Sequence, residues 1–215
     1  MNPYKTLLAE KTAEYLVQKS RFLGLATPVQ TEEEALALLR RVREEHRAAN
    51  HRCYAYILGQ NAGVMRYSDD GEPGGTAGMP ILEVLRARGV VNCAVVVTRY
   101  FGGILLGAGG LTRAYSHSCA LAVEAAGVCE MLPTQRWLCE VAYPLWDRVQ
   151  HALRGLPVRL ENTVFTTSVQ FELLTRTVDA DALLDTLARV TDGRAETLML
   201  EELYQPWPET AGQEA

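Results

Sequence analysis

Two glycine-rich stretches hold the residues whose types and spacing suggest chemistry. The first covers residues 69–78 and the second covers residues 99–113. Ten of the 17 glycines lie between Gly71 and Gly110, among segments that otherwise have the patterns of helix and strand. Glycine loses much backbone entropy on folding and fills no space in a core, so such a concentration requires a physical reason. We expect the backbone to approach another segment or a ligand closely at these positions.

The first stretch places three carboxylates, Asp69, Asp70 and Glu72, within four positions of a turn-forming sequence. Such a cluster can hold a divalent cation or perform acid–base catalysis. Two structural roles compete with this one. The carboxylates can accept hydrogen bonds from turn amides in a solvated loop, or lie at the positive end of the following helix. Because the acidic residues do not follow the pattern of a calcium loop, we predict no metal site.

The second stretch lies between a predicted buried strand and a predicted helix, where exposed amides and the positive helix end attract phosphate. No Gly-Lys-Ser/Thr follows, and Thr112 stands where a dinucleotide loop needs glycine or alanine, so we predict no nucleotide cofactor and no other cofactor. A polyanion backbone fits better, because Arg99 and Arg113 flank the loop, and the aromatic residues Tyr100, Phe101 and Tyr115 can stack on bases. The alternative is that the glycines let two segments cross and the aromatic residues belong to the core.

His51 and Cys53 lie two residues apart in a predicted strand, so their side chains face the same side. A thiol nucleophile with a histidine base can be imagined there. No third group that would orient the histidine is identifiable, and a core cysteine beside a surface histidine is the simpler interpretation. We therefore assign no catalytic residue.

The elements that must position these residues follow from hydrophobic periodicity and turn residues. Thr31 and Glu34 have the spacing of a capping box at the start of a helix. The apolar run at 92–98 predicts a strand covered on both faces, and Gly127 suits a helix end. For the first half we predict a strand or hairpin at 13–29, a helix at 32–47, paired strands at 51–59 and 64–67, a short helix around 81–85, the strand at 92–98 and a long helix opened by the second glycine stretch.

The second half of the chain has a simpler pattern of elements. It predicts a strand at 138–143, a helix at 144–153, strands at 158–164 and 167–174, a helix at 180–190 and a strand at 196–203. The order β-α-β-β-α-β is typical of a ferredoxin-like domain, with two helices on one face of an antiparallel sheet. We therefore predict an α+β protein with two domains, at 1–130 and 131–205, and a flexible tail at 206–215.

Composition is typical of a folded, soluble protein. The chain has 215 residues and is 48% hydrophobic. No apolar run reaches the roughly 18 to 20 residues that span a bilayer, and residues 1–10 lack the blocks of a secretory signal, so we expect a cytoplasmic protein with no membrane partner. Five cysteines without a CxxC pair argue against a disulfide framework or a zinc ribbon. The net charge is +1 over residues 1–130 and −6 over residues 131–215, which favours two domains and makes the first the better candidate for binding a polyanion.

Three motifs together carry a resemblance to a known family. They are Lys19-Ser20-Arg21-Phe22, Asp69-Asp70-Gly71-Glu72-Pro73 with Gly75-Thr76-Ala77-Gly78, and Arg99-Tyr100-Phe101-Gly102-Gly103-Ile104-Leu105-Leu106-Gly107 with Gly109-Gly110-Leu111 and Ala114-Tyr115. In these residues the chain resembles the YigZ/IMPACT family, from about residue 10 to 205. Gly74 stands where many members have alanine, and Phe101 where some have a second tyrosine.

The resemblance implies an N-terminal α/β sandwich of the superfold seen in domain IV of elongation factor G, and a C-terminal ferredoxin-like domain similar to domain V of that factor. It also implies contact with RNA or the ribosome, because the same two domains follow one another in a ribosomal translocase. The expected nucleic-acid or ligand surface consists of Arg21, Asp69, Asp70, Glu72, Gly75, Thr76, Gly78, Arg99, Tyr100, Phe101, Gly102, Gly103, Gly107, Gly109, Gly110 and Arg113.

Three functions remain open at this point. The first is a non-catalytic, ribosome-associated binding protein that contacts RNA and regulates translation. The second is an enzyme acting on a small or phosphorylated molecule between the glycine stretches, which requires at least two of the carboxylates to converge in a pocket. The third is a module that binds a translation-regulatory protein, with the acidic second domain facing a basic partner.

Overall fold

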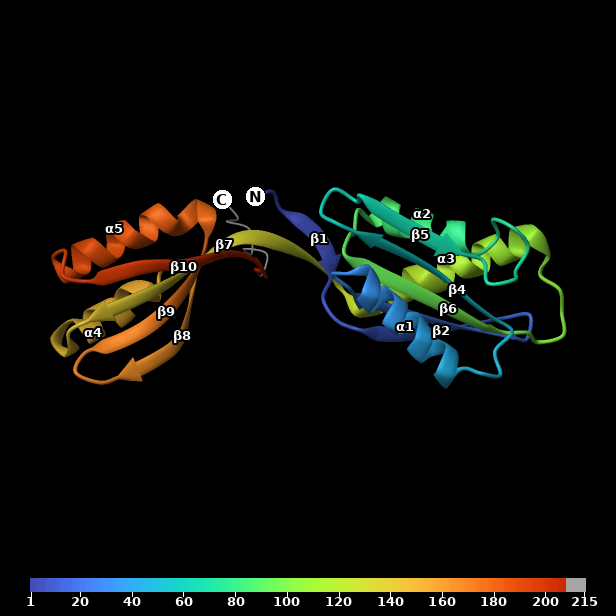
Figure 1. Cartoon of the computed structure of the whole chain (residues 1–215), viewed down its shortest axis with the longest axis horizontal. Helices are drawn as coiled ribbons and strands as arrows, with labels where there is room; N and C mark the ends of the chain where they lie inside the picture. Colours follow the sequence, from blue (N-terminus) through green and yellow to red (C-terminus); the bar gives the residue numbers. More distant parts are fainter. Residues whose placement is uncertain (208–215) are drawn as a thin grey trace. The chain divides into compact units, whose positions relative to one another are not determined.

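The computed structural model describes residues 1–207 of the chain (Figure 1). Its contacts divide the chain into two compact units. The N-terminal unit contains residues 4–130, and the C-terminal unit contains residues 1–3 together with residues 131–207. Both units are mixed α/β structures built on a sheet. Across residues 1–207, no helix combines the length and the apolar character needed to cross a membrane.

The N-terminal unit is organised around a five-stranded antiparallel sheet with the order β2-β3-β6-β4-β5. A short strand, β1 (Tyr4–Leu7), precedes it. The sheet strands are β2 (Lys11–Val17), β3 (Ser20–Pro28), β4 (His51–Leu58), β5 (Val64–Ser68) and β6 (Cys93–Tyr100). The predicted hairpin at 13–29 is confirmed as β2 and β3, and the pairing of 51–59 with 64–67 is confirmed as β4 and β5.

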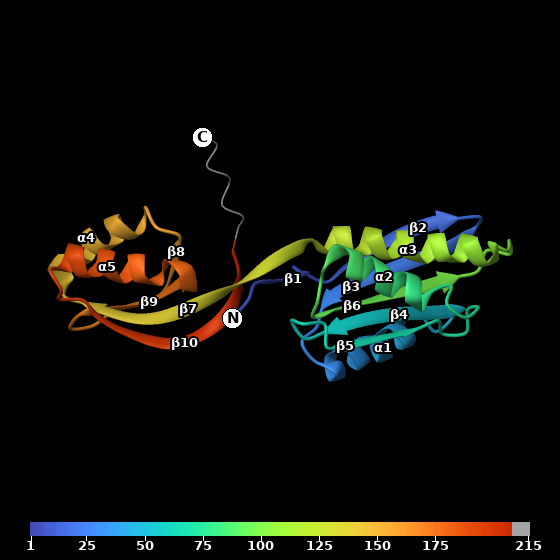
Figure 2. The same ribbon diagram turned by 90° about the horizontal axis from the view of Figure 1, so that it is seen from above.

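Helices cover both faces of this sheet (Figure 2). The helix α1 (Glu32–Glu45) packs on one face, whereas α2 (Gly78–Arg88) and α3 (Gly107–Ala126) pack on the other. The central strand β6 supplies both cores, because Val95 and Val97 face α2 and α3 while Ala94 and Val96 face α1. The prediction of a strand buried on both faces is therefore confirmed.

The start of α1 shows how far a local motif determines local structure. Thr31 is the N-cap, and its Oγ1 accepts a hydrogen bond from the amide of Glu34 at 3.2 Å. The Glu34 carboxylate accepts from the amide of Gln30 at 2.7 Å rather than from that of Thr31. Of the two hydrogen bonds of the predicted capping box, the one to Thr31 Oγ1 is present. The one to the Glu34 carboxylate comes from the residue before the N-cap.

The C-terminal unit has a sheet in which β10 pairs with β7, β7 with β9, and β9 with β8, all antiparallel. Two helices cover one face of it (Figure 2). The elements are β7 (Val128–Val141), α4 (Tyr143–Leu153), β8 (Val158–Phe165), β9 (Val169–Arg176), a 3-10 turn (Thr177–Asp179), α5 (Ala180–Thr191) and β10 (Glu196–Pro206). This order of elements and strands is that of the predicted ferredoxin-like fold. Its core forms around Trp146, Val149, Phe171, Leu183 and Leu187.

Two boundaries differ from those expected. β7 begins at Val128, ten residues before the predicted strand start, and Tyr143 opens α4 instead of closing the strand. Much of the first part of β7 is only half buried, so its alternation is weak, and long-range pairing with β10 determines its extent. Pro206, the first residue of the predicted tail at 206–215, instead belongs to β10 and pairs with Met131. Residues 208–215 of that tail lie outside the described residues.

Candidate functional site

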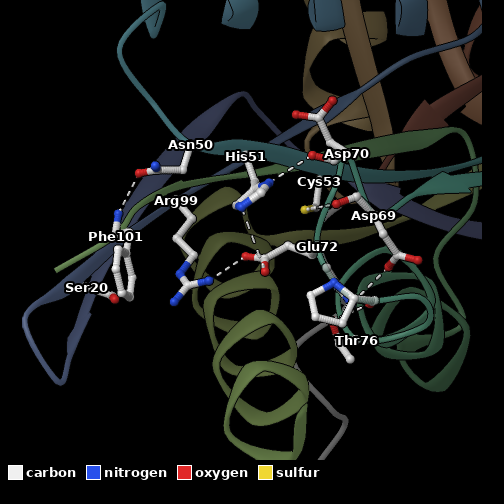
Figure 3. Close-up of polar contacts among 12 residues, drawn as sticks. Ser20, Asn50, His51, Cys53, Asp69, Asp70, Glu72, Thr76, Arg99 and Phe101 are labelled. Atoms are coloured by element: carbon white, nitrogen blue, oxygen red, sulfur yellow. Dashed lines mark hydrogen bonds and ion pairs between the residues drawn. The ribbon is translucent and has the colours of Figure 1, made fainter. Parts of the chain in front are cut away.

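The register of the N-terminal sheet brings both glycine-rich stretches to one end of it. Arg21 pairs with Tyr100, His51 pairs with Arg99, and Ser68 at the end of β5 pairs with Tyr54 near the start of β4. We call this end the loop end and define it as residues 18–19, 46–50, 69–77 and 101–106. Residues far apart in the sequence therefore meet there (Figure 3).

Asp69 closes the first glycine-rich stretch on itself. Its Oδ1 accepts hydrogen bonds from the amides of Ala77 (3.0 Å) and Gly78 (2.8 Å), and its Oδ2 accepts from the amide of Gly75 (2.8 Å). The carboxylate thus lies at the N-terminus of α2 and satisfies amides that would otherwise be free. Thr76 belongs to the same turn, because its hydroxyl donates to the carbonyl of Pro73 at 2.6 Å.

The other two carboxylates point elsewhere. Asp70 Oδ2 accepts from the amide of Arg52 at 2.7 Å, and its Oδ1 lies 3.5 Å from Arg43. The side chain of Glu72 is 3% exposed, and its Oε1 accepts from Arg99 Nη1 and from the Tyr115 hydroxyl, both at 2.7 Å. The convergence required for an ion or a substrate is absent from these three carboxylates. Across residues 1–207, no group of three or more His, Cys, Asp or Glu side chains is arranged to hold a metal ion.

Arg99 differs most from the role expected of it. Its side chain is 6% exposed and forms a buried ion pair with Glu72, so it is not a surface cation available to phosphate. The guanidinium carbon lies 5.4 Å from the ring centre of Phe22 and 5.4 Å from that of Phe101. Its Nε is buried without a hydrogen-bond partner among the described residues. The structure corrects the prediction, because Arg99 and Glu72 stabilise the interior beneath the loop end.

His51 and Cys53 do not form a catalytic pair. The His51 Nδ1 lies 2.9 Å from the carbonyl of Asp70, which makes Nδ1 the donor and leaves Nε2 facing Glu72 Oε2 at 3.9 Å. The thiol of Cys53 donates to the carbonyl of Asp69 at 2.9 Å. Burial raises the pKa of the Cys53 thiol to about 12, so the nucleophilic thiolate is disfavoured at neutral pH.

Close approach of the backbone explains two of the glycines. A Cβ on Gly102 would lie 2.0 Å from the backbone of Lys19, and one on Gly78 would lie 2.7 Å from the backbone of Ser68. These glycines let segments of the chain cross, as the structural alternative proposed. In contrast, a Cβ on Gly109 would meet only the end of the Arg113 side chain, at 3.6 Å, and one on Gly74 would meet nothing within 4 Å.

The N-terminus of α3, within the second stretch, faces outward. Gly107 begins the helix with φ +67°, a conformation that glycine adopts without strain. The preceding Leu106 makes no side-chain cap, and the first turn contains no acidic residue. Gly103 and Gly109 are exposed, Gly110 is half buried, and Arg113 is exposed one turn further along. Positive charge and free backbone donors therefore coincide here.

The aromatic residues of the second stretch divide between inside and outside. Phe101 is 43% exposed, and Ile104 and Leu105 beside it are 42% and 84% exposed. Tyr100 is half buried, and its hydroxyl lies 2.9 Å from His46 Nδ1. Arg21 is exposed and pairs with Glu14 at 2.8 Å. Phe101 is thus the most exposed of the three aromatic side chains considered for stacking, whereas Tyr115 is buried in the core.

Two residues outside the predicted surface hold the second stretch in place. Asn50 Oδ1 accepts from the amide of Phe101 at 2.8 Å, and Ser20 Oγ accepts from the amide of Gly102 at 3.2 Å (Figure 3). Asn and Ser are common at loops and strand ends because their side chains bond nearby amides. Their residue types indicate that they could bond a backbone amide. Which amide they bond depends on the sheet register, because the partner segment lies more than fifty residues away in the sequence.

Comparison with known proteins adds independent information. The Impact N-terminal domain matches residues 18–123, and a domain of unknown function, DUF1949, matches residues 139–194. A solved crystal structure of a hypothetical protein is 29% identical and superposes with a TM-score of 0.59, covering 94% of this chain and 98% of that one.

Two of the curated relatives are similar to the chain over most of their length, and a third over part of it. The chain is 34% identical to the IMPACT family member YvyE of Bacillus subtilis, over 91% of this chain and 90% of the relative. It is 33% identical to the IMPACT family member YigZ of Escherichia coli, over 86% of this chain and 92% of the relative. A Saccharomyces cerevisiae protein, Protein IMPACT homolog, is 35% identical over 41% of this chain and 35% of its own length. As its glycine-rich motifs predicted, the chain belongs to the IMPACT family.

Proposed function

We propose that the protein is a non-catalytic, cytoplasmic binding protein that contacts RNA, free or within the ribosome, and thereby regulates translation. The observation that carries the proposal is the uncapped N-terminus of α3, which lies beside exposed Arg113 and follows the exposed ring of Phe101. Membership of the IMPACT family fits a regulatory role. The five free cysteines fit a reducing compartment.

The contrast between α2 and α3 supports a phosphate contact at α3. Asp69 accepts hydrogen bonds from the amides of Ala77 and Gly78 at the start of α2, so these donors are already occupied within the protein. The start of α3 has neither a side-chain cap nor an acid in its first turn, and residues 99–123 contain no Asp or Glu. Free amides, a positive helix end and Arg113 attract a phosphate group from the same side.

Phe101 supports contact with unpaired bases. Asn50 fixes the backbone of Phe101, and the guanidinium of Arg99 packs near the ring. A ring held in this way loses little freedom when a base stacks on it, and base–aromatic stacking contributes about 1 to 3 kcal/mol per base. The predicted role in stacking thus moves from Tyr100 or Phe101 to Phe101 alone.

An enzymatic role has less support from the same residues. Asp69, Asp70 and Glu72 each bind separate partners within the protein, and the pKa of Cys53 is raised to about 12 by burial. These groups are occupied in holding the loops together, which leaves binding as the function that the loop end supports best.

The proposal is tested by titrating the full chain with single-stranded RNA and measuring fluorescence anisotropy at several salt concentrations. We expect Phe101→Ala to weaken binding about tenfold, and Arg113→Ala to reduce the salt slope by about one. Gly109→Ala should also weaken binding, since its methyl group meets only the flexible end of Arg113 in the fold but obstructs a phosphate at the helix end.

Matched controls separate binding from stability. Arg40→Ala removes an exposed arginine from α1 on the opposite face of the sheet, and Gly74→Ala adds a methyl group to the other glycine stretch, where it meets nothing. Both should bind RNA as the parent chain does. RNA affinity that is absent at low salt, or indifferent to Phe101 and Arg113, would exclude this surface.

A further inference from the structure

The outer edge of β10 in the C-terminal unit is open. Within residues 1–207, β10 pairs with β7 on one side, and no strand pairs with its other side. Three consecutive aliphatic residues on it are exposed: Leu198 (60%), Met199 (45%) and Leu200 (45%). A bulge between Met199 and Glu201 interrupts the register at this point. An open edge with apolar side chains is a surface onto which another extended chain can pair.

Carboxylates surround this aliphatic segment. Glu196 precedes it, and Glu201 and Glu202 follow it. On the neighbouring strand, Glu140 is opposite Glu196. Arg136, a cation of this region, is already shared among the carboxylates of Glu161, Glu172 and Glu201, at 3.2, 2.6 and 3.0 Å. The edge therefore combines free strand pairing, an apolar centre and excess negative charge.

We propose that the outer edge of β10 binds an extended, cationic segment of a partner protein by strand addition. The backbone of that segment pairs with β10. Successive aliphatic side chains at its centre pack on Leu198 and Met199, which point to opposite faces of the sheet, and Lys or Arg residues on either side face Glu196 and Glu202. This surface lies in a different unit from the RNA surface proposed above and does not depend on it.

The charge pattern disfavours two other occupants. A second copy of β10 pairing antiparallel around Met199 would place Glu196 of one chain opposite Glu202 of the other, and like charges opposed across strands are destabilising. A nucleic acid would bring phosphates to the same carboxylates. An extended basic polypeptide can pair with the strand edge, pack on the aliphatic residues and neutralise the carboxylates at the same time.

The test uses the full chain and short fluorescent peptides of alternating Lys and Val, with peptides of alternating Glu and Val as the reference. Anisotropy measures affinity, and amide chemical shifts locate the peptide on the protein. We expect binding of the Lys peptide only, with shifts confined to β10 and neighbouring β7. Glu196→Gln and Glu202→Gln should each weaken binding about threefold, as exposed ion pairs do, and Leu198→Ser should weaken it further.

Two control variants match the test variants in chemistry. Val164→Ser changes a side chain that is 51% exposed on β8, at the other edge of the same sheet. Asp147→Asn removes a charge at an exposed position of α4. Both variants should bind the Lys peptide with the affinity of the parent chain. The proposal is overturned if the shifts fall on β8, if the test variants bind like the parent chain, if RNA displaces the peptide from β10, or if sedimentation shows a dimer that Leu198→Ser dissociates.

Discussion

At the level of single residues, burial gives Arg99 a different role from the one its sequence context suggests. An arginine next to aromatic residues in a glycine-rich loop is a reasonable candidate for a phosphate contact. In the folded chain its guanidinium is enclosed near Phe22 and Phe101 and bonded to Glu72, which also accepts from Tyr115. Burial raises the pKa of the Tyr115 hydroxyl well above its ordinary range, which keeps it a neutral donor. The motif residues thus build the support beneath the proposed surface.

Removing one member of this pair should therefore affect stability strongly. We expect Arg99→Ala to lower the free energy of unfolding by about 3 to 5 kcal/mol, because it leaves the Glu72 carboxylate buried and unpaired. Urea denaturation measures this. Arg21→Ala is the matched control, since its pair with Glu14 is exposed and screened by solvent, so its loss should leave the free energy of unfolding nearly unchanged. Equal losses in the two variants would contradict the buried-pair interpretation.

At the scale of elements, the two glycine-rich stretches have diverged in role although both precede helices on the same face. The first is closed by Asp69, which caps α2 from within the loop. The second is held from outside by Asn50 and Ser20, and leaves the start of α3 uncovered. Crossing of segments explains Gly102 and Gly78, so only part of the glycine content is available to serve a ligand.

The crossing at Gly102 gives a prediction at this scale. A methyl group there would lie 2.0 Å from the backbone of Lys19, which cannot move as a side chain can. Gly102→Ala should lower the free energy of unfolding by about 3 kcal/mol, the upper end for overpacking. Gly74→Ala, where nothing lies within 4 Å, should leave it nearly unchanged. Thermal denaturation of both variants checks the difference, and a tolerated Gly102→Ala would contradict the close crossing.

At the scale of the whole molecule, the two units have separate cores and share one chemical property. Cys53 and Cys93 lie in the core of the N-terminal unit, and Cys139 lies in that of the C-terminal unit. Burial raises the pKa of each of these thiols to about 12, from an ordinary value near 9. Both units therefore favour neutral thiols when folded.

This property predicts loss of stability at alkaline pH. The stabilisation is fully present below pH 9 and is lost as pH rises toward 12, because the unfolded chain releases these protons first. Each thiol should contribute about 1.4 kcal/mol per pH unit in this range. Urea unfolding between pH 8 and 11 measures it, and Cys93→Ala should reduce the slope for the N-terminal unit. A slope that Cys93→Ala leaves unaltered would count against the assignment.

Most of the elements, and the family, can be predicted from the amino-acid sequence alone. The β-α-β-β-α-β order, the central strand β6 and the N-cap at Thr31 follow from periodicity and side-chain chemistry within a few residues of each other, which are local properties. The motifs identified the family because they are long. They also named most residues of the loop end, since glycine, acidic and aromatic residues are conspicuous there.

The contacts of those residues follow from the assembled fold and not from local sequence. Arg99 and Glu72 are 27 positions apart, and Asn50 and Phe101 are 51 apart, so their contacts depend on which strands become neighbours. The extent of β7 likewise depends on its pairing with β10, more than sixty residues later. Burial and pairing are properties of the assembled sheet, and they separate the Arg99 that supports the interior from the Arg113 that stays exposed.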